Sequence, residues 1–152
     1  MTGLQFFKRQ VISCNGDVYL RRWIIFRCDR FAVYLHKFER GDEDDCPHDH
    51  PWDFTSIVLW GGYTEERWYR DVIEGHMERW PDDLQRGWLS TARRMAEECH
   101  RVRNPYGPCW TLVITGPRRR SWGFQTRDGW VHWRTFLGLP AGDGPSNVES
   151  NQ

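Results

Sequence analysis

Residues 41–54 read GDEDDCPHDHPWDF, and this stretch holds the densest group of potential metal ligands in the chain. His48 and His50 stand two positions apart. Alternate side chains of an extended strand point to the same side, so both imidazoles should face one way. Two neutral imidazoles in that arrangement supply half of a divalent metal site. The stretch therefore predicts a metal centre next to a strand.

Short apolar or alternating segments, separated by turn residues, predict strands on both sides of this stretch. They cover residues 18–27, 31–38, 54–60, 63–69, 88–91, 99–103, 110–115, 121–126 and 130–137. The polar residues 75–86 are expected to form a loop. Because many short strands alternate with turns and helical periodicity is weak, the sequence predicts an all-β sandwich or barrel. We expect one domain over residues 4–139 and a disordered tail over residues 140–152.

A third histidine, His100, opens the predicted strand that covers residues 99–103. In a folded barrel, a strand distant in sequence can bring its imidazole opposite His48 and His50. Three protein ligands with further positions left open are typical of a catalytic metal rather than a closed structural one. The three histidines are therefore the predicted metal ligands.

These residues give the chain a resemblance to the cupin superfamily. The residues that match its two sequence motifs are Gly41, His48, His50 and Gly62 in the first, and His100 and Asn104 in the second. The resemblance implies a single-domain jelly-roll of two antiparallel sheets, with a metal site inside the barrel. It also implies a homodimer that forms through an exposed sheet.

The first cupin motif normally contains a glutamate, which would fall here at Phe54 or Thr55. Neither side chain carries a carboxylate, and three interpretations remain open. The site is a three-histidine centre, as in the thiol dioxygenases of this superfamily; or Asp53 supplies a carboxylate beside the histidines; or the metal site has decayed. Cys46 is a further candidate ligand because it shares the alternating position of His48 and His50.

Two other groups of side chains are candidates for contact with a substrate. Tyr34 and His36 share one face of a predicted strand and are candidate catalytic groups near the metal. The alternative for His36 is a buried core histidine. Arg118, Arg119 and Arg120 follow a Gly-Pro turn, and they are predicted to hold a carboxylate or phosphate. Trp122 is a candidate to stack on a ring or sugar of the substrate, with a place in the core as the alternative. The alternative for the three arginines is an exposed turn.

Composition limits the classes of function. The chain of 152 residues has 21 Lys and Arg against 21 Asp and Glu, and this zero net charge argues against a non-specific nucleic-acid binder. Its apolar runs are too short to span a bilayer, and no signal segment opens it. The five cysteines are odd in number and form no CxxC pair, which argues against a disulfide framework. We expect a cytoplasmic protein with neither a membrane nor a nucleic-acid partner.

The resemblance implies a metal-dependent enzyme that acts on a small polar or anionic molecule. Fe(II)-dependent oxygenation is the favoured reaction, with zinc, nickel or manganese as alternative metals for the same imidazoles. Two other functions stay open. One is a non-redox cupin lyase, isomerase or epimerase, and the other is a non-catalytic cupin that binds a small ligand.

Overall fold

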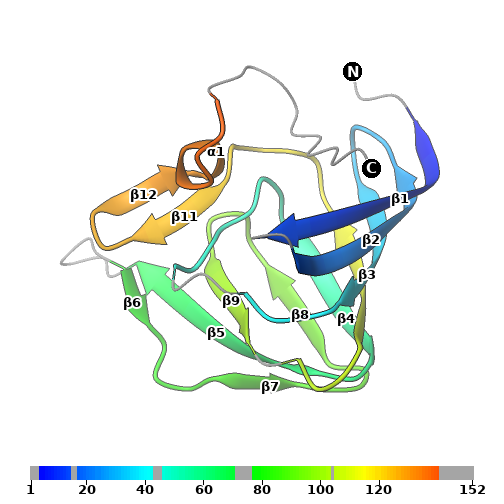
Figure 1. Cartoon of the computed structure of the whole chain (residues 1–152), viewed down its shortest axis with the longest axis horizontal. Coiled ribbons are helices and arrows are strands. Elements are labelled where there is room, and N and C mark those ends of the chain that lie inside the picture. Colours follow the sequence, from blue (N-terminus) through cyan, green and yellow to red (C-terminus); the bar gives the residue numbers. More distant parts are fainter. Residues whose placement is uncertain (1–3, 15–16, 43–45, 71–76, 104, 141–152) are drawn as a thin grey trace.

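The computed structural model of the chain describes residues 4–14, 17–42, 46–70, 77–103 and 105–140 (Figure 1). Within them lie twelve strands and one short helix. In chain order they are β1 (Gln5–Cys14), β2 (Asp17–Arg27), β3 (Ala32–Phe38), β4 (Phe54–Trp60), β5 (Tyr63–Arg70), β6 (Met77–Arg79), β7 (Leu84–Arg86), β8 (Thr91–Arg94), β9 (Cys99–Arg103), β10 (Cys109–Thr115), β11 (Gly123–Thr126), β12 (Gly129–His132) and α1 (Trp133–Phe136).

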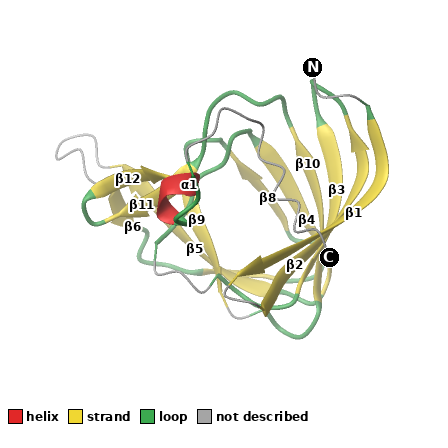
Figure 2. Cartoon of the chain, turned by 45° about the horizontal axis from the view of Figure 1, so that its top comes forward, coloured by secondary structure: helices red, strands yellow, loops and turns green. Residues whose placement is uncertain are grey.

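The strands form two antiparallel layers. One layer is a six-stranded sheet with the order β1-β2-β3-β10-β4-β8. In the opposite layer, β5 pairs with β6, β7 and β9, and β11 pairs with β12 as a hairpin. His48 forms isolated bridges with His100 of β9 and with Phe124 of β11, so it joins the hairpin to the rest of that layer. Figure 2 shows the six-stranded sheet on one side of the molecule and β5, β9 and the hairpin on the other.

The core lies between the two layers, because the strands bury alternate residues. In β3, for example, Ala32, Tyr34 and His36 are buried, and the residues between them are more exposed. The buried apolar side chains form two clusters. The first cluster contains Ile24, Ala32, Tyr34, Phe54 and Val113. The second contains Val58, Tyr63, Val102 and Cys109.

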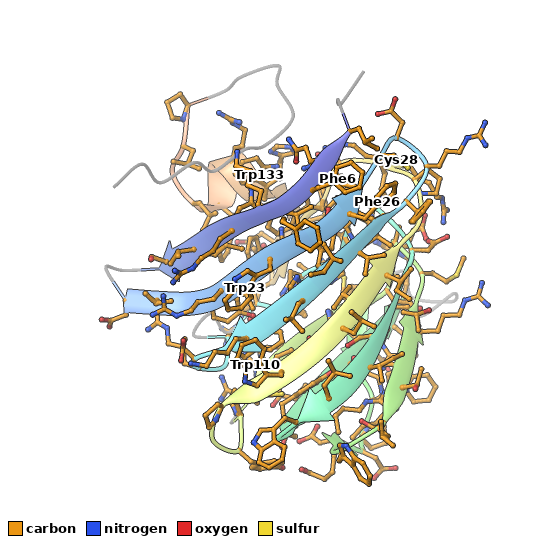
Figure 3. All side chains as sticks on the ribbon, turned by 90° about the vertical axis from the view of Figure 1, so that its right-hand side faces the viewer. Phe6, Trp23, Phe26, Cys28, Trp110 and Trp133 are labelled. Atoms are coloured by element: carbon orange, nitrogen blue, oxygen red, sulfur yellow. The ribbon has the colours of Figure 1, made fainter. Side chains whose placement is uncertain are left out.

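The outer face of the six-stranded sheet carries large aromatic side chains (Figure 3). The rings of Trp23 in β2 and Trp110 in β10 stack there, with centroids 5.3 Å apart. Part of the heavy tryptophan content therefore covers the outside of the sheet rather than filling the core. No helix among the described residues is long and apolar enough to cross a membrane.

The all-β architecture and most strands agree with the sequence prediction, and β4 and β9 have the predicted bounds. Three predictions are wrong. Residues 130–137 are not one strand, because β12 ends at His132, whose side chain accepts a hydrogen bond from the Arg134 backbone N–H and caps α1. The predicted loop 75–86 contains two short strands, β6 and β7, which both pair with β5.

The third wrong prediction is the strand at residues 88–91. Leu89 there has φ +59°, a left-handed turn conformation, and β8 begins only at Thr91. In addition, β1 was not predicted; it forms because β2 offers it an antiparallel edge. The domain limits stay a prediction, and residues 141–152 of the predicted tail lie outside the described residues.

Candidate metal centre

The three histidines predicted from their spacing lie together. One possible ligand nitrogen from each of His48, His50 and His100 lies within 4.8 Å of the other two. The Nε2 atoms of His50 and His100 are 2.8 Å apart. The ring centroids of the three imidazoles are 5.0–5.1 Å from one another. The site therefore combines one loop segment with one strand of the barrel wall.

Backbone pairing brings these histidines together. The backbone N–H groups of His48 and His100 each donate to the other residue's carbonyl oxygen, at 3.1 and 3.0 Å. The His50 N–H donates to the carbonyl oxygen of Ala96 at 3.0 Å. Since the segment is extended at His48, the two histidines of His-x-His face the same side, as the sequence predicts.

Asp49, the residue between the two histidines, points away from the cluster and is 2% exposed. Its carboxylate accepts hydrogen bonds from the Gly123 N–H at 2.7 Å, from the Trp130 indole at 2.9 Å and from Arg120. These contacts fix the His-x-His segment to the β11–β12 hairpin. Sequence analysis did not identify Asp49, although its alternation with the histidines is the signal that could have placed it on the opposite face.

Glu65 of β5 contacts the far side of His100. Its Oε1 lies 2.9 Å from His100 Nδ1, and the carboxylate is 1% exposed. Arg94 and Arg86 bind the same carboxylate, at 2.7 and 2.8 Å. Burial acts to raise the pKa of Glu65, but the hydrogen bonds and charges of His100 and Arg94 outweigh it and hold the pKa well below its usual range. Glu65 is therefore ionised and orients the His100 ring.

Glu65 was also missed by sequence analysis. The available signal was its position two residues after Tyr63, which places it on the inward face of the strand. A second carboxylate, Asp42, lies on the outer side of His48, with 3.8 Å between Asp42 Oδ2 and His48 Nδ1. Asp42 is held by the Tyr19 hydroxyl and by the Val102 N–H. Two of the three histidines thus have a carboxylate near Nδ1.

The donor set fits a divalent metal ion. Burial is the main cause that lowers the pKa of His48 and, to a greater extent, of His50, so both imidazoles are neutral near neutral pH and have a free lone pair for a metal. Metal–nitrogen bonds of about 2.0–2.1 Å would place two imidazole nitrogens roughly 3 Å apart. The 2.8 Å between His50 and His100 is close to that spacing.

Phe54, one of the two positions where the cupin motif would have its glutamate, forms an apolar wall of the site. Its ring centroid is 4.7 Å from that of His50 and 5.8 Å from that of His100. Among the described residues, the cluster that could hold a metal consists of the three histidines, and neither Asp53 nor Cys46 belongs to it. The Asp53 carboxylate instead accepts hydrogen bonds from the Ala96 N–H at 2.8 Å and from Arg119.

Tyr34 and His36, the predicted catalytic pair, are buried on the inner face of β3. His36 Nε2 accepts a hydrogen bond of 3.0 Å from Arg22 Nε. Burial first, and then the charge of Arg22, lowers the pKa of His36 well below its usual value. Trp122 lies beside His48, with ring centroids 6.4 Å apart, and stacks on Trp133 at 5.6 Å.

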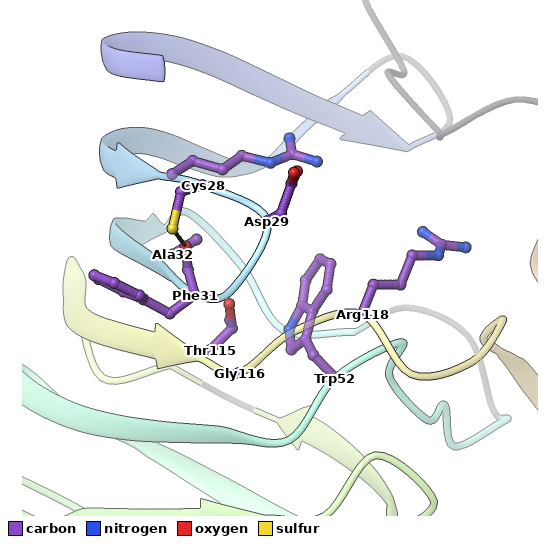
Figure 4. A pocket seen from close by; sticks show the side chains of 9 residues that line it. Cys28, Asp29, Phe31, Ala32, Trp52, Thr115, Gly116 and Arg118 are labelled. Atoms are coloured by element: carbon purple, nitrogen blue, oxygen red, sulfur yellow. Dashed lines mark hydrogen bonds between the residues drawn. The ribbon is translucent and has the colours of Figure 1, made fainter. Parts of the chain in front are cut away.

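The three predicted anion-binding arginines lie around the loop after β10. Arg119 forms ion pairs with Asp53 and Glu97, and Arg120 forms one with Asp49. Arg118 is exposed and lines a pocket of about 190 Å³ together with Trp52, Asp29 and the end of β10 (Figure 4). Two of these guanidiniums are thus already bound to carboxylates of the chain.

The two antiparallel sheets, with the histidine cluster between them, have the jelly-roll fold that cupins share. No family model matches the sequence, and no curated protein matches it. Solved structures do match. KdgF from Halomonas sp. is 16% identical with a TM-score of 0.53, and the match covers 76% of this chain and 96% of that one.

Two other matches are FeII HppE and the DMSP lyase DddQ from Ruegeria pomeroyi DSS-3. HppE is 11% identical with a TM-score of 0.52, and the match covers 71% of this chain and 56% of that one. DddQ is 16% identical with a TM-score of 0.52, and the match covers 72% and 56%. At these identities the likeness concerns the fold, and the present chain spans just over half of the HppE and DddQ chains.

Proposed function

We propose that this chain is a metal-dependent cupin enzyme that acts on a small polar or anionic substrate, and that its reaction is an Fe(II)-dependent oxygenation. The observation that carries the proposal is the cluster of three imidazole nitrogens within 4.8 Å of one another. When bound there, an iron(II) ion with three neutral ligands would supply open coordination positions and an uncompensated positive charge.

The chain's own residues would prepare this site. Glu65 and Asp42 lie near Nδ1 of His100 and of His48, which favours Nε2 as the metal-binding atom of each ring. Phe54 packs against His50 and His100 and keeps water from that side. Trp122 beside His48, and Tyr34 in the cluster that contains Phe54, are the proposed substrate contacts.

A non-redox lyase or isomerase is the second candidate. The observation that favours it is the pair of His36 and Tyr34 inside the barrel, with ring centroids 5.8 Å apart; burial holds the pKa of His36 well below its usual value. Such groups can accept or supply a proton while a zinc or nickel ion in the same ligand set polarises the substrate. The matched folds include both an Fe(II) protein and a lyase, so the fold is compatible with either reaction.

The test is elemental analysis of the purified protein, before and after anaerobic reconstitution with Fe(II). We compare the wild type with His48→Ala and His100→Ala, and use His132→Ala as a matched control because His132 caps α1 away from the cluster. The expected result is a single equivalent of iron in the wild type and in the control, and its loss in the other two variants. Oxygen uptake is then measured with a panel of small acids and alcohols.

Failure of the wild type to take up any metal would overturn the proposal. Uptake of zinc or nickel, together with turnover that consumes no oxygen, would support the lyase or isomerase instead. Tight ligand binding with no turnover under either condition would leave a non-catalytic binding protein.

A further inference from the structure

Arg22 of β2 points into the barrel. It shares one face of the strand with Leu20 and Ile24, which are both buried core residues. Its neighbours lie on the outer face, where Arg21 binds Glu39 at 2.6 Å and Trp23 stacks on Trp110. An arginine is unusual on an inward face, because burial of its charge costs free energy unless another charge compensates it.

The structure gives Arg22 neutral partners. Its Nε donates to His36 Nε2 at 3.0 Å, and its Cζ lies 5.0 Å from the centre of the Tyr34 ring. Among the described residues, no carboxylate forms an ion pair with it. Burial lowers the pKa of Arg22, but a guanidinium stays charged in a protein. The terminal nitrogens of this fork therefore lack a counter-ion.

A second polar group on the same inner surface also lacks a partner. Thr111 of β10 is 1% exposed, and its hydroxyl makes no hydrogen bond within the described part of the chain. Its strand neighbour is His36, and the other strand neighbour of His36 is Arg22. The three residues form one row across the inner face of the sheet, with a charged donor and a free hydroxyl on either side of His36.

This row lies in the same interior as the histidine cluster. Tyr34, beneath the Arg22 guanidinium, belongs to one packed cluster with Phe54, and the Phe54 ring lies 4.7 Å from that of His50. A small molecule that reached the histidines from inside the barrel would meet Arg22.

We propose that Arg22 binds an anionic group of the substrate, a carboxylate or a phosphate, through its terminal nitrogens, with the Thr111 hydroxyl as a second contact. His36 is then a positioning residue that fixes the guanidinium by accepting from Nε. A planar guanidinium whose two terminal NH2 groups point the same way matches the paired oxygens of either anion. The inference rests on the proposed function, since it concerns the substrate of the same metal centre.

Arg22→Gln is the informative variant. The Gln amide nitrogen takes the place of Arg Nε along the side chain, so it can still donate to His36 while the charged fork is removed. The matched control is Arg21→Gln, the adjacent residue on the outer face. Arg118→Gln tests the rival site in the pocket beside Trp52. Metal-loaded protein of each variant is titrated with malonate and, separately, with inorganic phosphate, and binding is followed by calorimetry and by thermal stability.

The wild type should bind at least one of the two probes, and preference for malonate or for phosphate identifies the anion. Arg22→Gln should weaken that binding by about tenfold or more, as expected for loss of a charge-assisted contact, while Arg21→Gln and Arg118→Gln leave it unchanged. In buffer without either anion, Arg22→Gln should melt at the same or a higher temperature than the wild type, because it removes a partly buried charge that has no counter-ion. A merely structural arginine would give the opposite shift.

Three results would overturn the assignment of Arg22: binding of neither anion by the wild type at millimolar concentration, unchanged binding in Arg22→Gln, or loss of binding in Arg118→Gln alone. The metal content of every variant is measured in the same samples. If metal is retained while any of these results is found, the Arg22 assignment fails and the proposed metal-dependent function stands. If the wild type holds no metal, the proposed function fails on its own measurement.

Discussion

The carboxylate of Glu65 lies 2.9 Å from Nδ1 of His100, while Nε2 of the same ring faces His50 at 2.8 Å. A carboxylate at one nitrogen holds the proton there and leaves the lone pair on the other nitrogen for a metal. Arg86 binds the other oxygen of this carboxylate, and Arg94 binds both of its oxygens. The metal centre is thus connected through one glutamate to an ion-pair network in the barrel wall.

Glu65→Gln should weaken metal binding by about 10- to 100-fold, the usual effect of removing an outer partner of a ligating histidine. The amide still fits the space, but it holds the His100 proton less strongly. Metal affinity is measured by competition with a chromogenic chelator. Glu66→Gln is the matched control, since Glu66 is the next residue, lies on the opposite face and binds Arg101 and Arg79. Equal affinities in the two variants would contradict the role of Glu65.

Asp49→Ala should destabilise the protein far more than Asp53→Ala, although both residues lie in the same segment. Loss of the buried Asp49 carboxylate leaves the Gly123 N–H and the Trp130 indole without an acceptor and Arg120 without its counter-ion, at a cost of about 3 kcal/mol in the free energy of unfolding. The Asp53 contacts are open to solvent, and their loss should cost less. Both free energies come from urea unfolding.

The variant Asp53→Ala also decides whether Asp53 is a metal ligand. Its carboxylate faces Ala96 and Arg119, so Asp53→Ala should keep its full metal content. Loss of the metal in Asp53→Ala, with unchanged stability, would restore Asp53 as a carboxylate ligand beside the three histidines.

Gly62→Ala should destabilise the fold, because the backbone at the end of β7 leaves no room for a methyl group. A Cβ at Gly62 would meet the Arg86 carbonyl oxygen at 2.5 Å and the Tyr106 ring at 2.9 Å. Overpacking of this kind costs about 1–3 kcal/mol. Gly87→Ala is the control, since a Cβ there meets nothing within 4 Å. Equal melting temperatures for the two variants would show that the backbone at Arg86 and the Tyr106 ring can shift to admit the methyl group.

The sequence was sufficient to place the histidines, because their arrangement depends on local geometry. Alternation along an extended segment puts His48 and His50 on one side, and the strand pattern makes His100 part of the barrel wall. The presence of glycine at position 62, which belongs to the motif, also has a local cause: the Arg86 backbone approaches too closely for a side chain. The cupin fold follows from the same short motifs and from the spacing of the strands.

The partners of the histidines could not be predicted, because they depend on strand register. Glu65 reaches His100 only because β5 and β9 pair with Glu66 opposite Arg101. Arg22 likewise reads as one of several arginines until Leu20 and Ile24 show which face is inward. The helix at Trp133–Phe136 was missed because a single capping histidine decides where the strand ends.

The stability of the metal-free protein should fall as the pH drops below about 6.5, the ordinary pKa of histidine in an unfolded chain. Burial lowers the pKa values of His48, His50 and His36 in the folded protein. Between the lowered pKa and 6.5, the unfolded chain therefore binds protons that the folded protein does not, and it gains stability relative to the fold. The contribution is complete above pH 6.5 and is lost as the pH falls through the folded-state pKa. Each histidine adds a slope of up to about 1.4 kcal/mol per pH unit. Urea unfolding between pH 7.5 and 5.5 measures this slope. The slope should decrease in His50→Gln and stay unchanged in the control His132→Gln. A free energy of unfolding that does not depend on pH over this range would show that these imidazoles are not buried.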